Sequence, residues 1–474
     1  MALHTIPFII DGEERIPSDT FEVRHPATGE VVHLGGIATE SDANAAVEAA
    51  AAAAPAWRDI IPDTRRDILL RAAEIMSKRQ SELEQYLMDE LGQGRGWGEF
   101  NVGVATSLIK DAAGRVSTLN GIVPRSAEPN TDAMILREPY GVVLAMAPWN
   151  APYILGTRAV LYPLAAGCTV VFKGSELAPK SMHAICTIFQ EAGLPKGVLN
   201  FITTTPAKAH AVTASLIANP HIKKINFTGS TPVGRIIGRM AGEHLKPVVL
   251  ELGGKAPAIV WEDANLELAA ECCSFGAFVN SGQVCMATER VIVHKKVSQA
   301  FQDKLREAVL RMWPEALVHI NEEAVKKNKR FIEDAISKGA SPLLDRDINA
   351  EETTRTRLRP FVITKVTPDM DIYAQESFGS TLSLMEVDSE DEAIRIANDT
   401  EFGLTSAVFT EDLRTGLRFA KKIETGAVHI NKMSVHDEVA LPHGGVKGSG
   451  YGRFNASFGL DEYLRTKTVT WRTC

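Results

Sequence analysis

The sequence contains few cysteines, no long apolar run and no block of basic residues, and each absence excludes a class of protein. Cysteine occurs only six times in 474 residues, too sparsely for a disulfide framework, and no CxxC pair suits a zinc site. The six are Cys168, Cys186, Cys272, Cys273, Cys285 and Cys474. This scarcity indicates a reducing compartment, and we expect no metal.

Apolar runs are too short for a secretory signal or a membrane span. The N-terminal segment MALHTIPFIIDGEERIP reaches acidic residues after a brief apolar stretch, and no later segment has the length needed to cross a bilayer. The net charge of −8 comes from interspersed acidic and basic residues, without a basic block that would follow a phosphate backbone. We therefore expect a cytoplasmic protein with neither a membrane nor a nucleic acid as its partner.

The apolar residues that are present, 45% of the chain, suffice for two or three packed domains. Residues 41–120 have a helical character, with the amphipathic stretch 64–91 as the main example. From residue 141, β-branched runs such as CTVVFK and PVVLEL alternate with helix-length segments. This alternation predicts a doubly wound parallel sheet, which binds ligands at the carboxyl ends of its strands. A similar succession over 257–410 predicts a second α/β domain.

Three polar residues lie where either chemistry or structure would explain them. Cys285, in FVNSGQVCMATER, is either a nucleophile or a small buried hydrophobe. Glu251 ends an apolar run before two glycines in LELGGKAP, as a cap or as a general base. Asn150, between two prolines in APWNAP, is an oxyanion donor or a turn residue. Taken singly, these segments do not separate the two interpretations.

Two further segments have the chemistry of a nucleotide site. The strand INF runs into TGSTPVG at 228–234 and then a helix, whose N–H groups and dipole would face a phosphate. An ordinary glycine turn with Ser230 or Thr231 as N-cap explains the same pattern. In VVFKGSELAP, Lys173 and Glu176 are spaced to reach one sugar, although a solvated surface pair has the same spacing.

Together and in this order, these segments resemble the aldehyde dehydrogenase superfamily. The resemblance extends from FEVRHPATGEVV at 21–32, through QESFGS at 375–380, to LPHGGVKGSGYGR at 441–453. The combination is far more specific than any one of its parts.

The resemblance implies the fold of that superfamily, with three parts. A Rossmann-like NAD-binding domain is expected over 1–121 and 141–253, an α/β catalytic domain over 254–447, and a small β oligomerisation element over 122–140 and 458–474. The alternating segment TKTVTW at 466–471 has the pattern of a strand without a partner nearby in sequence. We therefore expect a homodimer or homotetramer in which this strand pairs across the interface.

The resemblance also assigns the chemistry. Cys285 is implied as the nucleophile, with the thiohemiacetal oxyanion held by the Asn150 side chain and the Cys285 backbone N–H. Glu251 is implied as the base that activates water to hydrolyse the thioester. The implied reaction is the NAD-dependent oxidation of an aldehyde to a carboxylic acid. The other five cysteines match no motif of the family and are expected to be core or surface thiols.

The cofactor residues carry over by the same resemblance. Lys173 and Glu176 are implied as ligands of the adenosine ribose, Ser230 of the pyrophosphate and Glu376 of the nicotinamide ribose, with Phe378 beside it. The full implied set is Trp149, Lys173, Glu176, Gly229, Ser230, Gly234, Leu252, Glu376 and Phe378.

Within the superfamily, the chain is most similar to the salicylaldehyde, benzaldehyde and vanillin dehydrogenase group. The segments that carry this similarity are 151–165, CMATER at 285–290 and HINKMSVHDE at 429–438. They imply an aromatic aldehyde held by Trp97, Tyr153, Arg158, Val284 and Met286. The alternatives are that Trp97 packs in a helix interface and that Arg158 pairs with a nearby acid.

Three departures from the family pattern bear on cofactor fit and loop mobility. Ser380 replaces the usual proline, His443 replaces the phenylalanine of PFGG, and the segment 313–321 is shorter than usual. Other readings of the function remain: an acylating enzyme that uses coenzyme A, oxidation of an aminoaldehyde or cyclic imine in a biosynthetic pathway, or a silent family member that acts as a binding protein.

Overall fold

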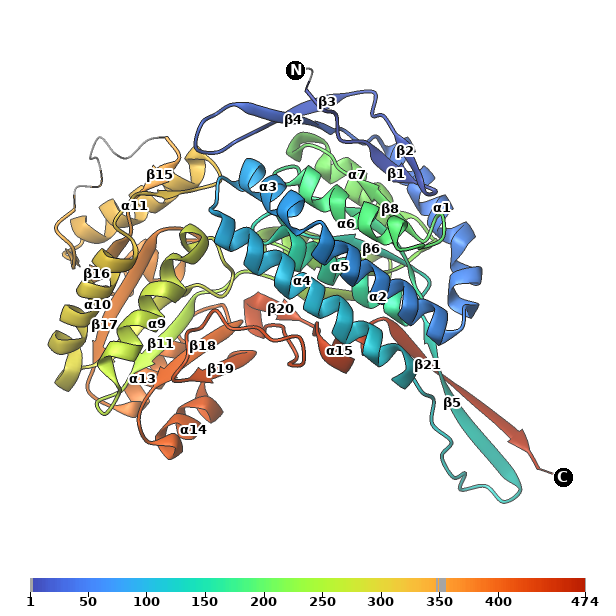
Figure 1. Ribbon diagram of the computed structural model, residues 1–474. Helices are drawn as coiled ribbons and strands as arrows, with labels where there is room; N and C mark the ends of the chain where they lie inside the picture. The colour runs from blue at the N-terminus through green and yellow to red at the C-terminus, as the bar shows by residue number, and fades with distance from the viewer. Residues whose placement is uncertain (1–2, 347, 349–354, 474) are drawn as a thin grey trace.

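The alternating strands and helices form two lobes, each built on its own sheet, with a two-stranded arm extending from the larger one (Figure 1). The structure is a computed structural model, and it describes residues 3–346, 348 and 355–473. The predicted α/β class, with two successive sheets, is confirmed. The chain passes from the first sheet to the second between residues 251 and 256 and returns to the first sheet at 450. The finer domain boundaries stay a prediction.

The first sheet has eight strands in the order β2-β1-β8-β7-β6-β9-β10-β20. In that order they are Glu13–Arg15, Phe8–Ile10, Leu199–Ile202, Thr169–Lys173, Val142–Met146, Ile222–Thr228, Val248–Glu251 and Gly450–Tyr451. The five from β8 to β10 are parallel to their neighbours, whereas β1 and β20 join antiparallel at the flanks. The chain winds from β6 outward to β8 and then returns to start β9 on the other side of β6. The gap between the ends of β6 and β9 is therefore the topological switch point, where such sheets bind ligands.

Strand residues of the first sheet alternate between two cores, as the pleat requires. Val143 and Ala145 face one helical layer, formed by α2 to α6, whereas Val142 and Leu144 face the layer of α1, α7 and α8. The helices are α1 Glu40–Asp59, α2 Pro62–Lys78, α3 Gln80–Leu91, α4 Arg95–Arg115, α5 Pro152–Ala166, α6 Pro179–Glu191, α7 Pro206–Ala218 and α8 Thr231–Glu243. The stretch 64–91, predicted as one amphipathic unit, is two helices that meet at Arg79.

The second sheet has seven strands in the order β14-β16-β17-β12-β11-β18-β19, all parallel except β14. In that order they are Ser341–Pro342, Phe361–Thr364, Thr381–Val387, Thr288–His294, Ala256–Val260, Thr405–Phe409 and Ala427–Ile430. The sequence reasoning did not identify β17 or β19. The helices packed on the sheet are α9 Leu266–Phe278, α10 Ser298–Met312, α11 Glu322–Ser337, α13 Glu390–Asn398 and α14 Leu413–Lys422.

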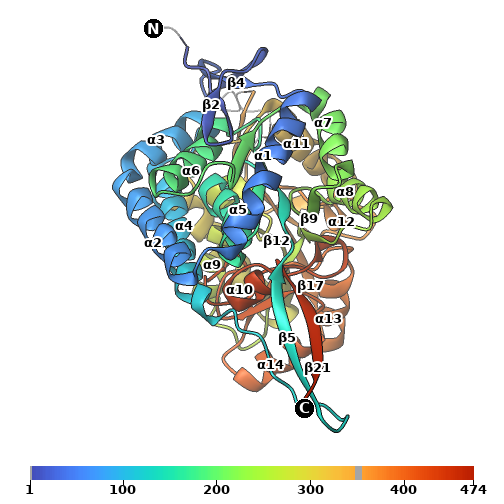
Figure 2. The ribbon, with the colours of Figure 1, turned by 90° about the vertical axis from the view of Figure 1, so that its right-hand side faces the viewer.

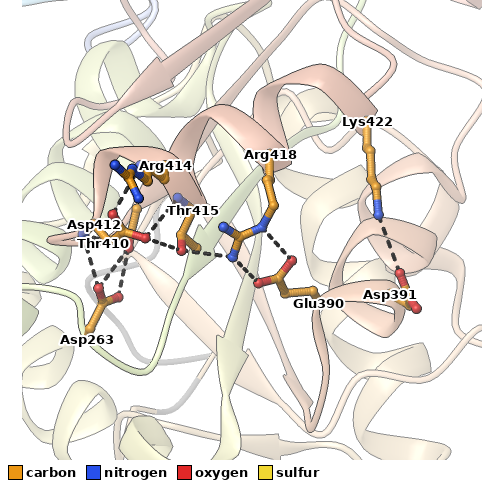
Figure 3. Close-up of polar contacts among 9 residues, drawn as sticks. All are labelled: Asp263, Glu390, Asp391, Thr410, Asp412, Arg414, Thr415, Arg418 and Lys422. Atoms are coloured by element: carbon orange, nitrogen blue, oxygen red, sulfur yellow. Dashed lines mark hydrogen bonds and ion pairs between the residues drawn. The ribbon is translucent and has the colours of Figure 1, made fainter.

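Polar contacts attach α14 to its surroundings in the second lobe (Figure 3). Asp412 is the N-cap, and its carboxylate accepts from the Thr415 N–H at 3.1 Å. Asp263, after β11, accepts from the Asp412 N–H at 3.1 Å and so fixes the start of the helix. Arg418 pairs with Glu390 at the first residue of α13. The cap fixes the start of α14, because it satisfies first-turn N–H groups that have no partner within the helix. The Arg418–Glu390 ion pair joins α14 to α13.

The arm consists of β5, Thr131–Pro139, and β21, Leu464–Arg472. The two strands pair antiparallel over their whole length and extend away from the lobes (Figures 1 and 2). The C-terminal strand therefore has a partner in its own chain, and its pairing across a subunit interface stays a prediction. The family resemblance placed the two segments in one β element, whereas their pairing has no local signal, because the strands are separated by more than 300 residues. Cys474 lies outside the described residues.

Smaller elements complete the described chain. They are the hairpin β3 Thr20–Arg24 with β4 Val31–Gly36, the pair β13 Leu317–Val318 with β15 Arg357–Leu358, and the short helices α12 Asp371–Ala374 and α15 Ala456–Asp461. Among the residues that the structure describes, no helix combines the length and the apolar character needed to cross a bilayer.

Candidate active site

A cavity of about 260 Å³ lies at the switch point of the first sheet, and we call it the switch-point cavity. Most of its walls come from the ends of β6, β9 and β10 and from the loops that follow them, together with the loop before β17. Its lining includes nine of the predicted site residues: Trp149, Asn150, Gly229, Ser230, Glu251, Leu252, Cys285, Glu376 and Phe378. The sheet topology therefore gathers groups that are far apart in the sequence.

A smaller cavity of about 50 Å³, which we call the apolar cavity, lies next to it. It is lined largely by side chains of α4 and α5 and by the segments 284–286 and 435–443. Of the predicted substrate residues, Trp97, Arg158, Val284 and Met286 are in this lining. Cys285 and Asn150 line both cavities, so the thiol stands where the two meet.

Cys285 follows a turn of unusual backbone conformation. Asn280, Ser281 and Gly282 all have φ between 50° and 74°, a left-handed stretch that costs energy for the two non-glycine residues. Glycine is required at the third position, since a Cβ on Gly282 would lie 2.1 Å from the Gly379 carbonyl oxygen. The Asn280 amide offsets part of the cost by donating to the carbonyl oxygens of Asn150 at 3.0 Å and Gln283 at 3.2 Å. The thiol is thus held at a fixed place.

The segment 317–320 braces this turn, and it explains two departures from the family pattern together. Ser281 Oγ donates to the Val318 carbonyl oxygen at 2.7 Å. The Ser380 N–H donates to Nε2 of His319 at 3.3 Å, and the Ser380 hydroxyl lies 3.1 Å from the same nitrogen. Burial lowers the pKa of His319 to about 4, so the ring stays a neutral acceptor. A proline at 380 would lack the N–H, so the serine and the short histidine-bearing segment fit one another.

The Asn150 side chain is oriented by its neighbours. Its Nδ2 donates to the Gln283 carbonyl oxygen at 2.9 Å, while the backbone carbonyl oxygen of Asn150 accepts from the Trp97 indole at 3.1 Å. A carboxamide nitrogen carries two N–H groups, so one remains for a ligand after this bond. The Trp97 indole N–H is used in the scaffold, and the ring faces the apolar cavity, stacked on Phe100 at 5.4 Å.

Cys285 and Glu251 share a buried environment. Burial, and then the neighbouring Glu251 carboxylate, raise the pKa of the Cys285 thiol well above its ordinary value. Glu251 is 1% exposed, and its Oε2 has no hydrogen-bond partner among the described residues. Its Oε1 lies 3.4 Å from Nε2 of His443. The thiol is therefore protonated in this state, beside a carboxylate that has an unused oxygen.

No side chain caps the first turn of α8. Ser230 occupies the N-cap position but makes no side-chain cap hydrogen bond, and the Thr231 hydroxyl donates to the Gly448 carbonyl oxygen instead. First-turn N–H groups that no side chain caps suit a phosphate. Gly234, one turn on, is needed for packing, because a Cβ there would lie 2.4 Å from Leu252. These residues fit a dinucleotide cofactor.

Lys173 and Glu176 lie at the same edge of the sheet but not in the lining of the switch-point cavity. Lys173 is the last residue of β7, and Glu176 follows in the next turn. Burial lowers the pKa of Lys173, which Glu176 partly counteracts. The ammonium group of a lysine carries three N–H donors, and a single neighbouring carboxylate does not use all of them. Donors therefore remain for a ligand.

Glu376 is held by a network that the sequence reasoning missed. Its Oε1 accepts from the Gly254 N–H at 2.9 Å, and burial followed by the charge of Glu289 raises the pKa of Glu376 to about 7. Glu289 accepts from the Phe378 N–H at 3.0 Å and pairs with the buried Lys255. Glu289 and Lys255 thereby fix the loop that presents Glu376. Glu289 lies in the motif CMATER and Lys255 in LELGGKAP, but nothing in the sequence indicates that these two side chains form an ion pair.

One predicted substrate residue, Tyr153, lies outside the lining of the apolar cavity. Tyr153 is fully buried, and its hydroxyl donates to the Leu83 carbonyl oxygen at 2.7 Å, so it contacts α3 and does not line the apolar cavity. Helical geometry explains this, since Ile154, Leu155 and Arg158 share the other face of α5. Arg158 lines the cavity but also pairs with Asp437, as the alternative interpretation held.

Comparisons with known proteins agree with this geometry. The sequence model of the aldehyde dehydrogenase family matches residues 14–469. A vanillin dehydrogenase from Pseudomonas sp. strain HR199 is 42% identical over 475 residues, 98% of this chain and 97% of the relative. A salicylaldehyde dehydrogenase from Pseudomonas sp. strain C18 is 37% identical, over 95% and 94%. The crystal structure of a salicylaldehyde dehydrogenase from Pseudomonas putida G7 complexed with salicylaldehyde matches with a TM-score of 0.96 and 36% identity, over 99% and 98%.

Proposed function

The chain belongs to the aldehyde dehydrogenase family, and from that premise we propose that it oxidises aromatic aldehydes to carboxylic acids with NAD as cofactor. The observation that carries the proposal is the position of Cys285, which lines both a cavity at a dinucleotide switch point and a separate apolar cavity. A thiol between these two cavities can bond to an aldehyde carbon on one side while a cofactor lies on the other.

The residues divide the reaction into two chemical stages. The Cys285 sulfur attacks the aldehyde carbon as its proton passes to Glu251, and the resulting oxyanion receives the free N–H of Asn150. Bound NAD supplies the hydride acceptor in the switch-point cavity. Before the second stage Glu251 gives up the proton that it took from the thiol. It then takes a proton from a water molecule whose oxygen attacks the thioester, the carbon–sulfur bond breaks, and the carboxylic acid leaves.

The proposal of an aromatic substrate rests on the apolar cavity. Trp97 and Phe100 form a stacked aromatic wall, and the small volume favours a flat ligand over a branched one. Arg158 is already paired with Asp437, so the cavity offers no net positive charge to a second carboxylate on the substrate. The vanillin and salicylaldehyde dehydrogenases described above bear names of the same substrate class.

We propose NAD rather than NADP because of Glu176. A carboxylate at the adenosine ribose accepts hydrogen bonds from two hydroxyls but repels a 2′-phosphate. Assembly as a homodimer or homotetramer through the β5/β21 arm is likewise proposed, because a two-stranded ribbon that projects from its own chain leaves edges open to pairing. The expected cytoplasmic location stays a prediction.

An aldehyde panel read by NADH absorbance tests the substrate class. Benzaldehyde-type substrates should exceed acetaldehyde in kcat/KM by about tenfold or more, the rate equivalent of about 1.4 kcal/mol. Trp97→Ala should reduce that preference more than it reduces activity toward acetaldehyde. Phe275→Ala, which removes an exposed aromatic side chain in the second lobe, is the matched control and should leave the preference intact. Equal or better turnover of acetaldehyde, or of an aminoaldehyde, would contradict the aromatic assignment.

A further inference from the structure

His443 separates the apolar cavity from another cavity on its far side. That second space, which we call the histidine cavity, has a volume of about 260 Å³. Its ionisable lining residues are His429, His436, Asp437, Glu438 and His443. His443 and Asp437 line both the histidine cavity and the apolar cavity, so their side chains form part of the wall between the two.

The two imidazole nitrogens of His443 point to two different carboxylates. Nε2 lies 3.4 Å from Oε1 of Glu251, and Nδ1 lies 3.8 Å from Oδ1 of Asp437. Asp437 is itself fixed by Arg158 and by Asn455, whose Nδ2 donates to it at 2.8 Å. Although burial alone would raise it, Arg158 and His443 hold the pKa of Asp437 below its ordinary value. Asp437 therefore remains a carboxylate that can stabilise an imidazolium.

Glu251 needs a route by which to lose a proton. Its side chain is 1% exposed, so a proton on it leaves either through the switch-point cavity, which the reactants occupy during turnover, or through a neighbouring side chain. Apart from the Cys285 thiol, His443 is the only ionisable side chain with a recorded polar contact to Glu251 among the described residues. The main chain of His443 is held by paired hydrogen bonds with Phe454, at 3.0 and 2.8 Å, so the backbone that carries the ring is fixed.

Building on the proposed function, we propose that His443 is a proton-relay residue, which takes the proton from Glu251 and releases it into the histidine cavity. In thioester hydrolysis the water oxygen bonds to the acyl carbon, and one water proton passes to Glu251. The carbon–sulfur bond then breaks, Cys285 leaves as a thiolate, and the acid product keeps the other proton. Transfer from Glu251 to Nε2 of His443 restores the carboxylate, and Asp437 stabilises the cation that forms.

The surroundings of His443 suit this role on every side. The titratable and charged groups that face it are Glu251 from β10, Cys285, Arg158 from α5, Asp437, His429 from β19 and His436. Burial lowers the pKa of His429 to about 4, so it does not compete as a cation. His436 pairs with Glu438 at 2.8 Å, and Glu438 is half exposed, so the histidine cavity leads to solvent.

An activated ester tests the relay without aldehyde or cofactor. p-Nitrophenyl acetate should acylate Cys285 with a burst of nitrophenolate, after which steady turnover reports the hydrolysis that the relay serves. His443→Ala should keep the burst within about twofold but lower the steady rate by about tenfold or more. Added imidazole should restore that rate, whereas pyrazole, which has the same shape but is hardly basic, should not.

Several results would overturn the relay. They are an unchanged steady rate, a burst lost together with turnover, and equal restoration by pyrazole, which would mean that His443 only fills space. If His443→Ala does not fold, His443→Gln decides, because it keeps an N–H for Glu251 but cannot carry a proton. Wild-type turnover in His443→Gln would show that His443 only orients Glu251 and does not carry its proton. Failure of aldehyde oxidation in the wild-type protein would contradict the proposed function separately, since the ester assay needs no aldehyde.

Discussion

The two cavities that meet at Cys285 are built in different ways. Much of the switch-point cavity is backbone and short side chains at the ends of three neighbouring strands, for example Gly229, Ser230 and Gly253. The apolar cavity is made mainly of large side chains from α4, α5 and distant loops, such as Trp97, Ile154 and Val435. The strand order fixes the first, whereas the second depends on how helices pack and which rotamers they select.

This difference separates what the fold determines from what individual side chains determine. A parallel sheet that reverses its winding between β6 and β9 presents a switch point whatever its surface residues are. The ring at position 97 or the charge pairing of Arg158 can change without altering any strand. Substitutions at Cys285 or Asn150, which line both cavities, should therefore affect both, whereas a substitution at a residue that lines only one cavity should affect that one alone.

Replacing Cys285 with alanine should have the largest effect, because it removes the proposed nucleophile, which stands where the two cavities meet. We expect aldehyde oxidation to fall by about 10⁴-fold or more, as for other covalent nucleophiles. NAD binding, measured by quenching of tryptophan fluorescence, should remain within about twofold of wild type. Cys272→Ala, which removes another partly exposed thiol, is the control and should retain activity. Near wild-type turnover in Cys285→Ala would refute the nucleophile assignment.

Glu251→Gln should separate the two chemical stages. Turnover should fall by about 10²-fold or more, and the acyl thioester should accumulate as a mass adduct on the peptide that contains Cys285. Coenzyme A should not restore turnover, in contrast to an acylating enzyme.

The same variant gives a pH readout with a defined sign. Because Glu251 raises the pKa of Cys285, its removal should lower that pKa and shift the rise in alkylation by iodoacetamide to lower pH. A shift to higher pH, without adduct accumulation, would show that Glu251 serves only to ionise the thiol.

Glu176→Ser tests the cofactor side alone. Removing the carboxylate should narrow the preference for NAD over NADP by about 1–3 kcal/mol, since a 2′-phosphate would no longer face a like charge. The ratio of kcat/KM values for the two cofactors at saturating aldehyde measures this. The aldehyde preference should not change in the same variant. An NADP preference in the wild-type protein would contradict the proposed role of Glu176.

The sequence predicted much of the switch-point cavity because its signals are local. A strand that ends in a glycine turn, as at 225–234, is visible in a single window, and so is Glu251 at the end of an apolar run. The family resemblance supplied the roles that these windows left open. The geometry then explained why glycine is needed at 282, which the sequence could not show.

The apolar cavity was predicted less well, for a physical reason. Which face of α5 lines it depends on the packing of α5 against α3, so Tyr153, predicted to line the cavity, contacts α3, whereas its neighbours Ile154 and Arg158 do line the cavity. The contact between His443 and Glu251, and the Glu289–Lys255 pair, join residues distant in the chain. No periodicity encodes such contacts. The pairing of β5 with β21 likewise has no local signal, and only the family resemblance placed the two segments in one β element.

The smallest effect on activity is expected for a substitution at a residue that lines neither cavity. Asn265 is the N-cap of α9, and its side-chain oxygen accepts from the Leu268 N–H at 3.1 Å. Asn265→Ala should lower the free energy of unfolding by about 1 kcal/mol, as loss of a cap does, while Asn265→Ser should restore most of it. Urea unfolding measures this, and kcat/KM should stay at the wild-type value, since the cap lies at the opposite end of α9 from the turn that holds Cys285. A fall in kcat/KM without loss of stability would mean that a shift of α9 also moves the Cys285 thiol. The turn at 280–282 and the segment 317–320 would then hold the nucleophile less firmly than their hydrogen bonds indicate.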